Sequence, residues 1–92
     1  MTVRERDVEA YLKVSVERGG GVCWKWTGQR GVPDRVVVLP AGRVVFVEVK
    51  TTGGKLSALQ RKAIKTLEAL GAEVAVVWSK EDVDALLAFT PY

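Results

Sequence analysis

Two acidic residues and one lysine lie at the ends of two segments that the sequence predicts as neighbouring β-strands. Asp34 is in a turn before one apolar run, and Glu48 and Lys50 are near the end of the next run. Side chains alternate across a strand, so Glu48 and Lys50 project from the same face. If the two runs form a hairpin, Asp34 comes beside Glu48. Two carboxylates then offer oxygen ligands to a hard divalent cation, with an ammonium group next to them. This is the outline of a metal-dependent phosphodiesterase site.

Each part of this pattern also has a purely structural interpretation. Pro33-Asp34 is a common turn pair, and an exposed strand often alternates charged residues with valine to remain soluble. A charged pair that ends a long apolar strand, preceded by a glycine-rich turn with an acid, is much rarer than either part. The combination therefore favours the metal site.

Three segments in order along the chain resemble a known family. Gly31-Val32-Pro33-Asp34-Arg35, Glu48-Val49-Lys50 and Leu56-Ser57-x-x-Gln60 are similar to the motifs of the PD-(D/E)XK nuclease superfamily. More narrowly, they resemble the stand-alone VRR-NUC domain, the virus-type replication-repair nuclease. The resemblance covers nearly the whole chain, so one such domain is expected over residues 1–92.

The residues and the resemblance together give roles to the candidate site. Asp34 and Glu48 are expected to bind Mg²⁺ or Mn²⁺, and the resemblance adds the backbone carbonyl of Val49 as a third ligand. Lys50 would orient the attacking water or neutralise charge that builds on the phosphate. The resemblance also implies a catalytic Gln60 that touches Lys50 or the water. A capping box with Ser57 is the structural alternative for Gln60, and one side chain can serve both.

The family implies a further catalytic carboxylate on the first helix. Glu9 borders the apolar stripe of that helix and is the expected residue, with Glu5 as the alternative. An exposed pair of Glu9 with Lys13 is the structural interpretation.

Basic residues gather in the half of the chain that carries the motif. The side chains expected to contact nucleic acid are Lys25, Arg30, Arg35 and Lys55. Trp24 and Trp26 could stack on bases, but a small domain needs large core side chains. We therefore predict that both tryptophans are part of the core.

The composition excludes several kinds of chemistry. The 92 residues include one cysteine and no histidine, so a disulfide within the chain, a histidine general base and a Cys–His nucleophile are excluded. The formal net charge is +3, which permits an acidic polymer as partner. No apolar run reaches membrane-spanning length and no signal peptide opens the chain, so we expect no membrane partner. The expected location is the cytoplasm of a bacterial or phage-infected host cell.

The periodicity predicts an α/β fold with the order αβββαβα. The expected helices cover residues 3–18, 57–70 and a short segment after Ser79, and the expected strands cover residues 22–27, 35–39, 43–50 and 73–78. The last strand follows a crossover helix and should run parallel to its partner. A mixed sheet flanked by helices is the restriction-endonuclease-like architecture.

These features predict a metal-dependent, structure-selective DNA endonuclease. Stand-alone members of the family resemble virus-encoded resolvases, so a homodimer that cuts branched DNA such as a Holliday junction is expected. A nicking or flap nuclease, a restriction-type nuclease and a non-catalytic nucleic-acid-binding module are the alternatives. Acids beside a phosphate would not help a module that only binds. Apolar side chains that could form the dimer interface are Trp26, Phe89 and Tyr92.

Overall fold

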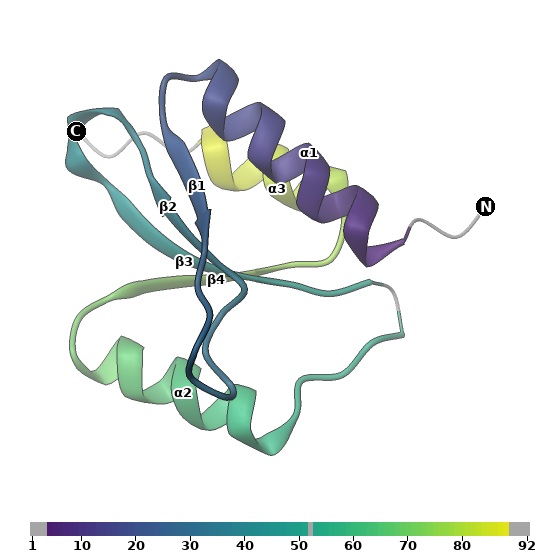
Figure 1. Cartoon of the computed structure of the whole chain (residues 1–92), viewed down its shortest axis with the longest axis vertical. Coiled ribbons are helices and arrows are strands. Elements are labelled where there is room, and N and C mark those ends of the chain that lie inside the picture. Colours follow the sequence, from purple (N-terminus) through teal and green to yellow (C-terminus); the bar gives the residue numbers. More distant parts are fainter. Residues whose placement is uncertain (1–3, 52, 89–92) are drawn as a thin grey trace.

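The computed structural model describes residues 4–51 and 53–88, and it has the predicted order of elements (Figure 1). The elements are α1 (Glu5–Arg18), β1 (Val22–Lys25), β2 (Arg35–Val38), β3 (Val44–Val49), α2 (Ala58–Ala69), β4 (Glu73–Val77) and α3 (Lys80–Ala88). A short 3-10 turn, η1 (Pro40–Gly42), joins β2 to β3. The αβββαβα prediction is therefore confirmed.

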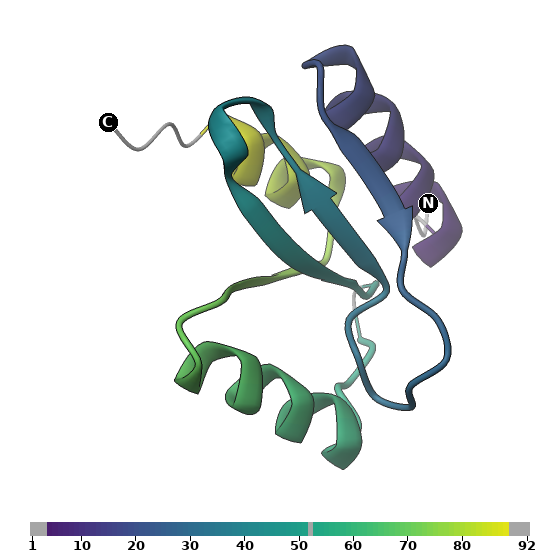
Figure 2. The same ribbon diagram turned by 60° about the vertical axis from the view of Figure 1, so that its left-hand side comes forward.

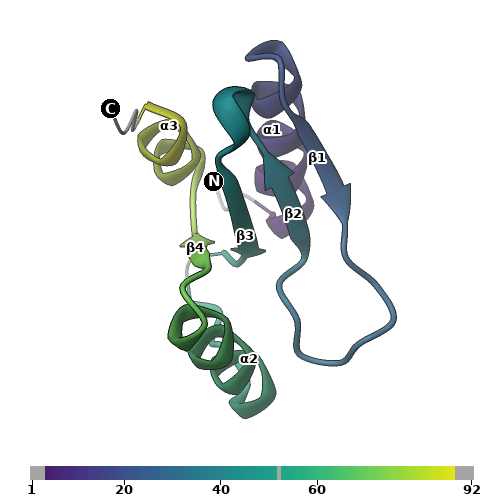
Figure 3. The same ribbon diagram turned by 90° about the vertical axis from the view of Figure 1, so that its left-hand side faces the viewer.

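The four strands form one mixed sheet in the order β1-β2-β3-β4. The first three strands are antiparallel, and β4 runs parallel to β3, as the crossover through α2 requires. Figures 1 and 3 show α1 and α3 packed together on one side of the sheet and α2 on the other.

The buried core lies on the α1 and α3 side. Residues four apart on α1, namely Val8, Leu12 and Val16, pack there against alternate valines of the strands. Those valines are Val37, Val45, Val47, Val49 and Val77. By contrast, α2 has no fully buried residue. The sheet is thus sealed on one side and only partly covered on the other.

Trp24 corrects the prediction that both tryptophans of the first strand are core residues. Its side chain is 65% exposed, whereas its neighbour Cys23 is buried. Cys23 faces the α1 side, so Trp24 faces the other side, where α2 does not reach it. Trp26 is half-buried and packs on Phe46, with ring centroids 5.1 Å apart.

The helix boundaries refine two other predictions. Helix α1 begins at Glu5 with Arg4 as its N-cap residue, and the Arg4 side chain makes no capping hydrogen bond. Helix α3 follows Ser79 as predicted, and Ser79 caps it, since the N–H of Asp82 donates to Ser79 Oγ at 3.1 Å. Among residues 4–51 and 53–88, no helix is long and apolar enough to span a membrane.

Gly21 allows the chain to pass closely between α1 and β2, which gives a stability prediction. A Cβ at this position would lie 2.6 Å from the carbonyl oxygen of Val38, whereas one at Gly19 would meet nothing closer than 3.6 Å. We expect Gly21→Ala to lower the free energy of unfolding by about 1–3 kcal/mol because backbone atoms must move. Urea denaturation measures this, with Gly19→Ala as the matched control. Equal stability of the two variants would contradict the close approach.

Candidate active site

The hairpin register brings the two predicted metal ligands together. Arg35 pairs with Val47 in the β2–β3 ladder. Continuing that register by one residue puts Asp34 opposite Glu48, on the same face of the sheet. The backbone N–H of Val49 donates to Asp34 Oδ2 at 2.8 Å and so fixes the carboxylate at the strand end.

Glu48 is a buried carboxylate that is only partly satisfied. Its side chain is 1% exposed. Its Oε2 atom accepts a hydrogen bond from Gln60 Nε2 at 3.1 Å and lies 3.7 Å from the ammonium of Lys50. Its Oε1 atom is buried and has no hydrogen-bond partner among the described residues. A buried polar atom without a partner is costly, and such atoms often mark a site for an ion or a ligand.

The electrostatic environment of Glu48 also favours a cation. Burial, followed by the negative charge of Asp34, raises the pKa of Glu48 from 4.5 to about 7, while Lys50 acts in the opposite direction. Two carboxylates this close repel each other when both are ionised. A divalent cation would remove that repulsion and give Oε1 a partner, so the residues fit such an ion.

The carbonyl of Val49 can complete the ligand set. In a strand, the N–H and C=O of one residue point to the same side, and the N–H of Val49 points to Asp34. The residue opposite Val49 in the ladder is Pro33, which has no N–H to donate. Within the described residues, no group of three or more Asp, Glu, Cys or His side chains could hold a metal. The position of the Val49 carbonyl is thus compatible with the third ligand that the family resemblance implies.

Gln60 forms the predicted capping box and also contacts the candidate site, although through Glu48 and not through Lys50. Its Oε1 accepts from the N–H of Ser57 at 2.8 Å and its own N–H donates to Ser57 Oγ at 3.1 Å, which completes the capping box. Its Nε2 remains available and donates to Glu48. The start of α2 is thereby fixed to the end of β3.

Glu9 lies on the other side of the sheet from Glu48. Its Oε2 accepts from Arg35 Nε at 2.7 Å. The charge of Glu5, by contrast, contributes to the raised pKa of Glu48. A catalytic role for Glu9, or for Glu5 as the alternative, stays a prediction.

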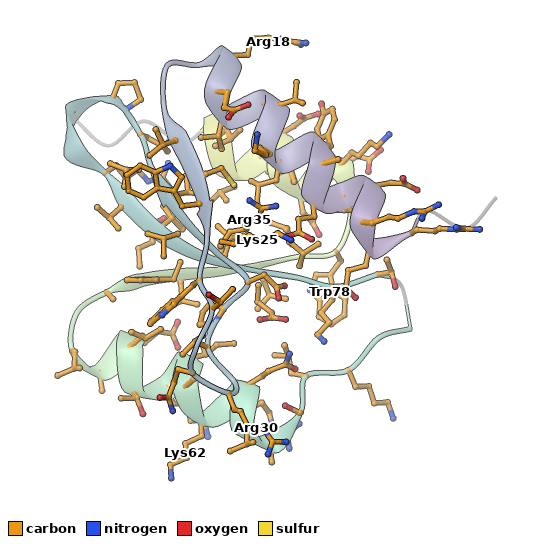
Figure 4. The ribbon with its side chains drawn as sticks, viewed as in Figure 1. Arg18, Lys25, Arg30, Arg35, Lys62 and Trp78 are labelled. Atoms are coloured by element: carbon orange, nitrogen blue, oxygen red, sulfur yellow. The ribbon has the colours of Figure 1, made fainter. Side chains whose placement is uncertain are left out.

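Arg35 corrects one of the predictions for nucleic-acid contacts. Its side chain is nearly buried, and besides Glu9 it donates to the carbonyl of Cys23 at 3.1 Å. Its guanidinium therefore holds β1 and α1 together and is not available at the surface. Lys25, Arg30 and Lys55 are exposed, as a phosphate contact requires. In Figure 4, Lys25 lies beside Arg35 near α1, whereas Arg30 lies at the α2 end of the molecule.

Trp78 lies near the site, although the sequence analysis assigned it no role. Val49 pairs with Val77 in the parallel ladder, so the next position puts Trp78 beside Lys50. The backbone N–H of Trp78 donates to Asp82 Oδ2 at 2.8 Å, which fixes the end of β4 to α3. The sequence predicted that the strands at 43–50 and 73–78 run parallel. The register between these two strands is what places Trp78 beside Lys50.

Comparison with known proteins identifies the class and the family. The family model described as the VRR-NUC domain matches residues 17–81. The phage protein named "Putative nuclease p44", from Acyrthosiphon pisum secondary endosymbiont phage 1, is 39% identical over an alignment of 87 residues, and the match covers 92% of this chain and 92% of that protein. A solved structure described as a VRR_NUC domain matches with a TM-score of 0.84 and 34% identity, covering 95% of this chain and 97% of that one.

The fold and the acid–lysine site define a nuclease with the restriction-endonuclease-like architecture. Within that class, the chain belongs to the VRR-NUC family. The resemblance drawn from the segments around Asp34, Glu48 and Gln60 is confirmed.

The raised pKa of Glu48 gives a prediction for the metal-free protein. Between pH 4.5 and 7 the folded protein keeps a proton on Glu48 that the unfolded chain releases. The free energy of unfolding in EDTA should therefore fall as the pH rises through this window, by about 2 kcal/mol. Urea denaturation at pH 5 and pH 7.5 measures the loss.

Glu48→Gln keeps the shape of the side chain and removes the proton equilibrium. This variant should lack the loss between pH 5 and pH 7.5, whereas Glu81→Gln, at an exposed acid on α3, should retain it. An undiminished loss in Glu48→Gln would show that another group is responsible.

Proposed function

We propose that this VRR-NUC protein is a metal-dependent DNA endonuclease that hydrolyses phosphodiester bonds and prefers branched DNA. The observation that carries the proposal is that the carboxylates of Asp34 and Glu48 lie opposite each other at the end of the β2–β3 ladder. The Oε1 atom of Glu48 is buried there and has no hydrogen-bond partner among the described residues. A protein that only bound nucleic acid would be weakened by two acids beside a phosphate. The phage relative, which is named as a nuclease, supports the same conclusion.

The residues around the carboxylates have separate tasks in this proposal. Asp34, Glu48 and the Val49 carbonyl would hold Mg²⁺ or Mn²⁺, which would supply positive charge that favours ionisation of water and stabilises charge on the phosphate. Gln60 holds the Glu48 carboxylate in one orientation. Lys50, whose ammonium is 3.7 Å from Glu48, orients the water or neutralises charge on the phosphate.

The proposed substrate is branched DNA, and the proposed enzyme is a homodimer. Paired cuts across a branch point require two active sites related by a twofold axis, and a homodimer provides such a pair. The exposed Trp24, together with Val44 on the same face of the sheet, offers apolar surface for a second copy. Of the interface candidates from the sequence, Trp26 is in part used within the monomer, and Phe89 and Tyr92 lie outside the described residues. The proposed place of action is the cytoplasm of a bacterial or phage-infected cell.

Cleavage assays test the proposed function directly. Wild-type protein should cut four-way junctions faster than flapped or linear duplexes in Mg²⁺ or Mn²⁺ and cut none of them in EDTA. Asp34→Asn removes a charged ligand with little change of shape, so cleavage should fall by at least about 100-fold while DNA affinity is retained. Preferred cutting of flaps or of one short sequence would instead favour a flap nuclease or a restriction-type enzyme.

A second measurement separates loss of metal from loss of fold. Mg²⁺ or Mn²⁺ should raise the Tm of the wild type because it binds only the folded site. Asp34→Asn should lack this rise and keep its Tm in EDTA. Near-normal turnover of Asp34→Asn at moderate Mg²⁺ would refute the assigned site.

The proposed homodimer gives a prediction for Trp24. Light scattering at micromolar concentration should give about twice the 10.1 kDa mass of one chain. Trp24→Glu should give the monomer mass, because a charge in an apolar interface is costly. Leu70→Glu is the matched control, since Leu70 is exposed at the end of α2. A monomer mass for the wild type, with and without junction DNA, would exclude the paired-cut model.

A further inference from the structure

A groove lies next to the candidate active site, between α2 and the loop that joins β1 to β2. It has a volume of about 280 Å³. The loop contributes Gln29, Arg30 and Val32, and α2 contributes Leu59 and Lys62. Trp26, at the start of the loop, also lines it. Figure 2 shows the loop extending from the sheet toward the first turns of α2.

Two contacts hold the groove in a fixed shape. The N–H of Trp26 donates to the carbonyl of Asp34 at 3.0 Å and closes the base of the loop. At its tip, Gly31 has φ +83°, and a Cβ there would lie 2.9 Å from the carbonyl oxygen of Leu59. The loop therefore rests directly on the first turn of α2, and the groove exists before any ligand binds.

The chemistry of the groove suits a nucleotide. Trp26, Val32 and Leu59 supply an apolar and aromatic surface, while Arg30 and Lys62 supply positive charge. Within residues 4–51 and 53–88, neither of these two cations forms an ion pair and no acidic residue lines the groove. In Figure 4, Arg30 and Lys62 lie near each other at this end of the molecule. An aromatic surface flanked by cations is the usual arrangement for binding unpaired bases.

We infer that this groove binds one unpaired nucleotide of the DNA substrate, with the base against Trp26 and Leu59 and the phosphate between Arg30 and Lys62. The volume is near the lower end of small-ligand sites, roughly 300 Å³, and suits a single nucleotide. The inference rests on the proposed nuclease function and adds to it a means of substrate selection.

The position of the groove explains how it would select a substrate. Val32 is two residues before Asp34, and Leu59 directly precedes Gln60, which binds Glu48. A nucleotide in the groove is therefore close to the phosphate at the metal site. DNA with an unpaired nucleotide beside a duplex can occupy both at once, as when a base pair opens at a branch point or a strand end carries a single-stranded extension.

Binding of two DNA probes in EDTA tests the inference. One probe is a blunt duplex, and the other is the same duplex with a single-stranded extension. The wild type should bind the extended probe more tightly. Arg30→Ala/Lys62→Ala should weaken binding of the extended probe roughly tenfold more than binding of the blunt one. The control Lys13→Ala/Arg18→Ala removes the same charge from α1 and should affect both probes equally.

A second variant separates a base site from a merely positive surface. Leu59 is half exposed, so Leu59→Lys should fold normally. It adds a positive charge but removes apolar surface, so it should lose the preference for the extended probe. Tighter binding of both probes with the preference intact would overturn the inference.

Other results would also overturn it. If Arg30→Ala/Lys62→Ala weakens both probes equally while the wild type still cuts DNA in Mg²⁺, only the groove inference fails. A wild type that neither binds nor cuts DNA refutes the proposed function together with the inference. A change of solution mass in Leu59→Lys with unchanged DNA preference would mean that a second copy fills the groove.

Discussion

The burial of Glu48 is the constraint on which the rest of the site depends. A carboxylate removed from water must be neutralised, hydrogen-bonded or paired with a cation. Gln60 and Lys50 both approach its Oε2 atom, and Oε1 is left without a partner among the described residues. The raised pKa is the consequence in the metal-free protein. Asp34, opposite Glu48 in the register, increases this cost and would also provide the second ligand for the proposed cation that removes it.

One side of the sheet provides most of the stability of the fold, and the other side carries the candidate site. The side that faces α1 and α3 holds all of the buried valines, so it provides most of the hydrophobic stabilisation. The other side carries Glu48 and Asp34 and is covered only in part by α2, which buries no residue completely. That incomplete cover leaves Trp24 exposed and creates the groove beside Trp26. A site that must admit DNA can tolerate such openings because the opposite side is well packed.

Local patterns in the sequence predicted what depends on local geometry. The alternation of valines fixed the strands, and the turn before Asp34 brought it beside Glu48 because a hairpin register follows from local pairing. The capping box of Gln60 follows from its place three residues after Ser57. Features that depend on distant packing were missed. Whether Trp24 is covered depends on where α2 lies, and the partner of Glu9 is Arg35, 26 residues away.

The contact between Glu9 and Arg35, which the sequence did not predict, also supports the candidate site, because Arg35 directly follows Asp34. Adjacent residues of a strand point to opposite faces, so Asp34 faces the metal site while Arg35 faces α1. Arg35 binds Glu9 of α1 and the carbonyl of Cys23 in β1. These bonds hold the start of β2 from the far side of the sheet, at the point where the backbone passes from the loop to the strand. Through Arg35, Glu9 therefore supports the strand end that carries Asp34, although the Glu9 side chain lies on the other face of the sheet from Glu48.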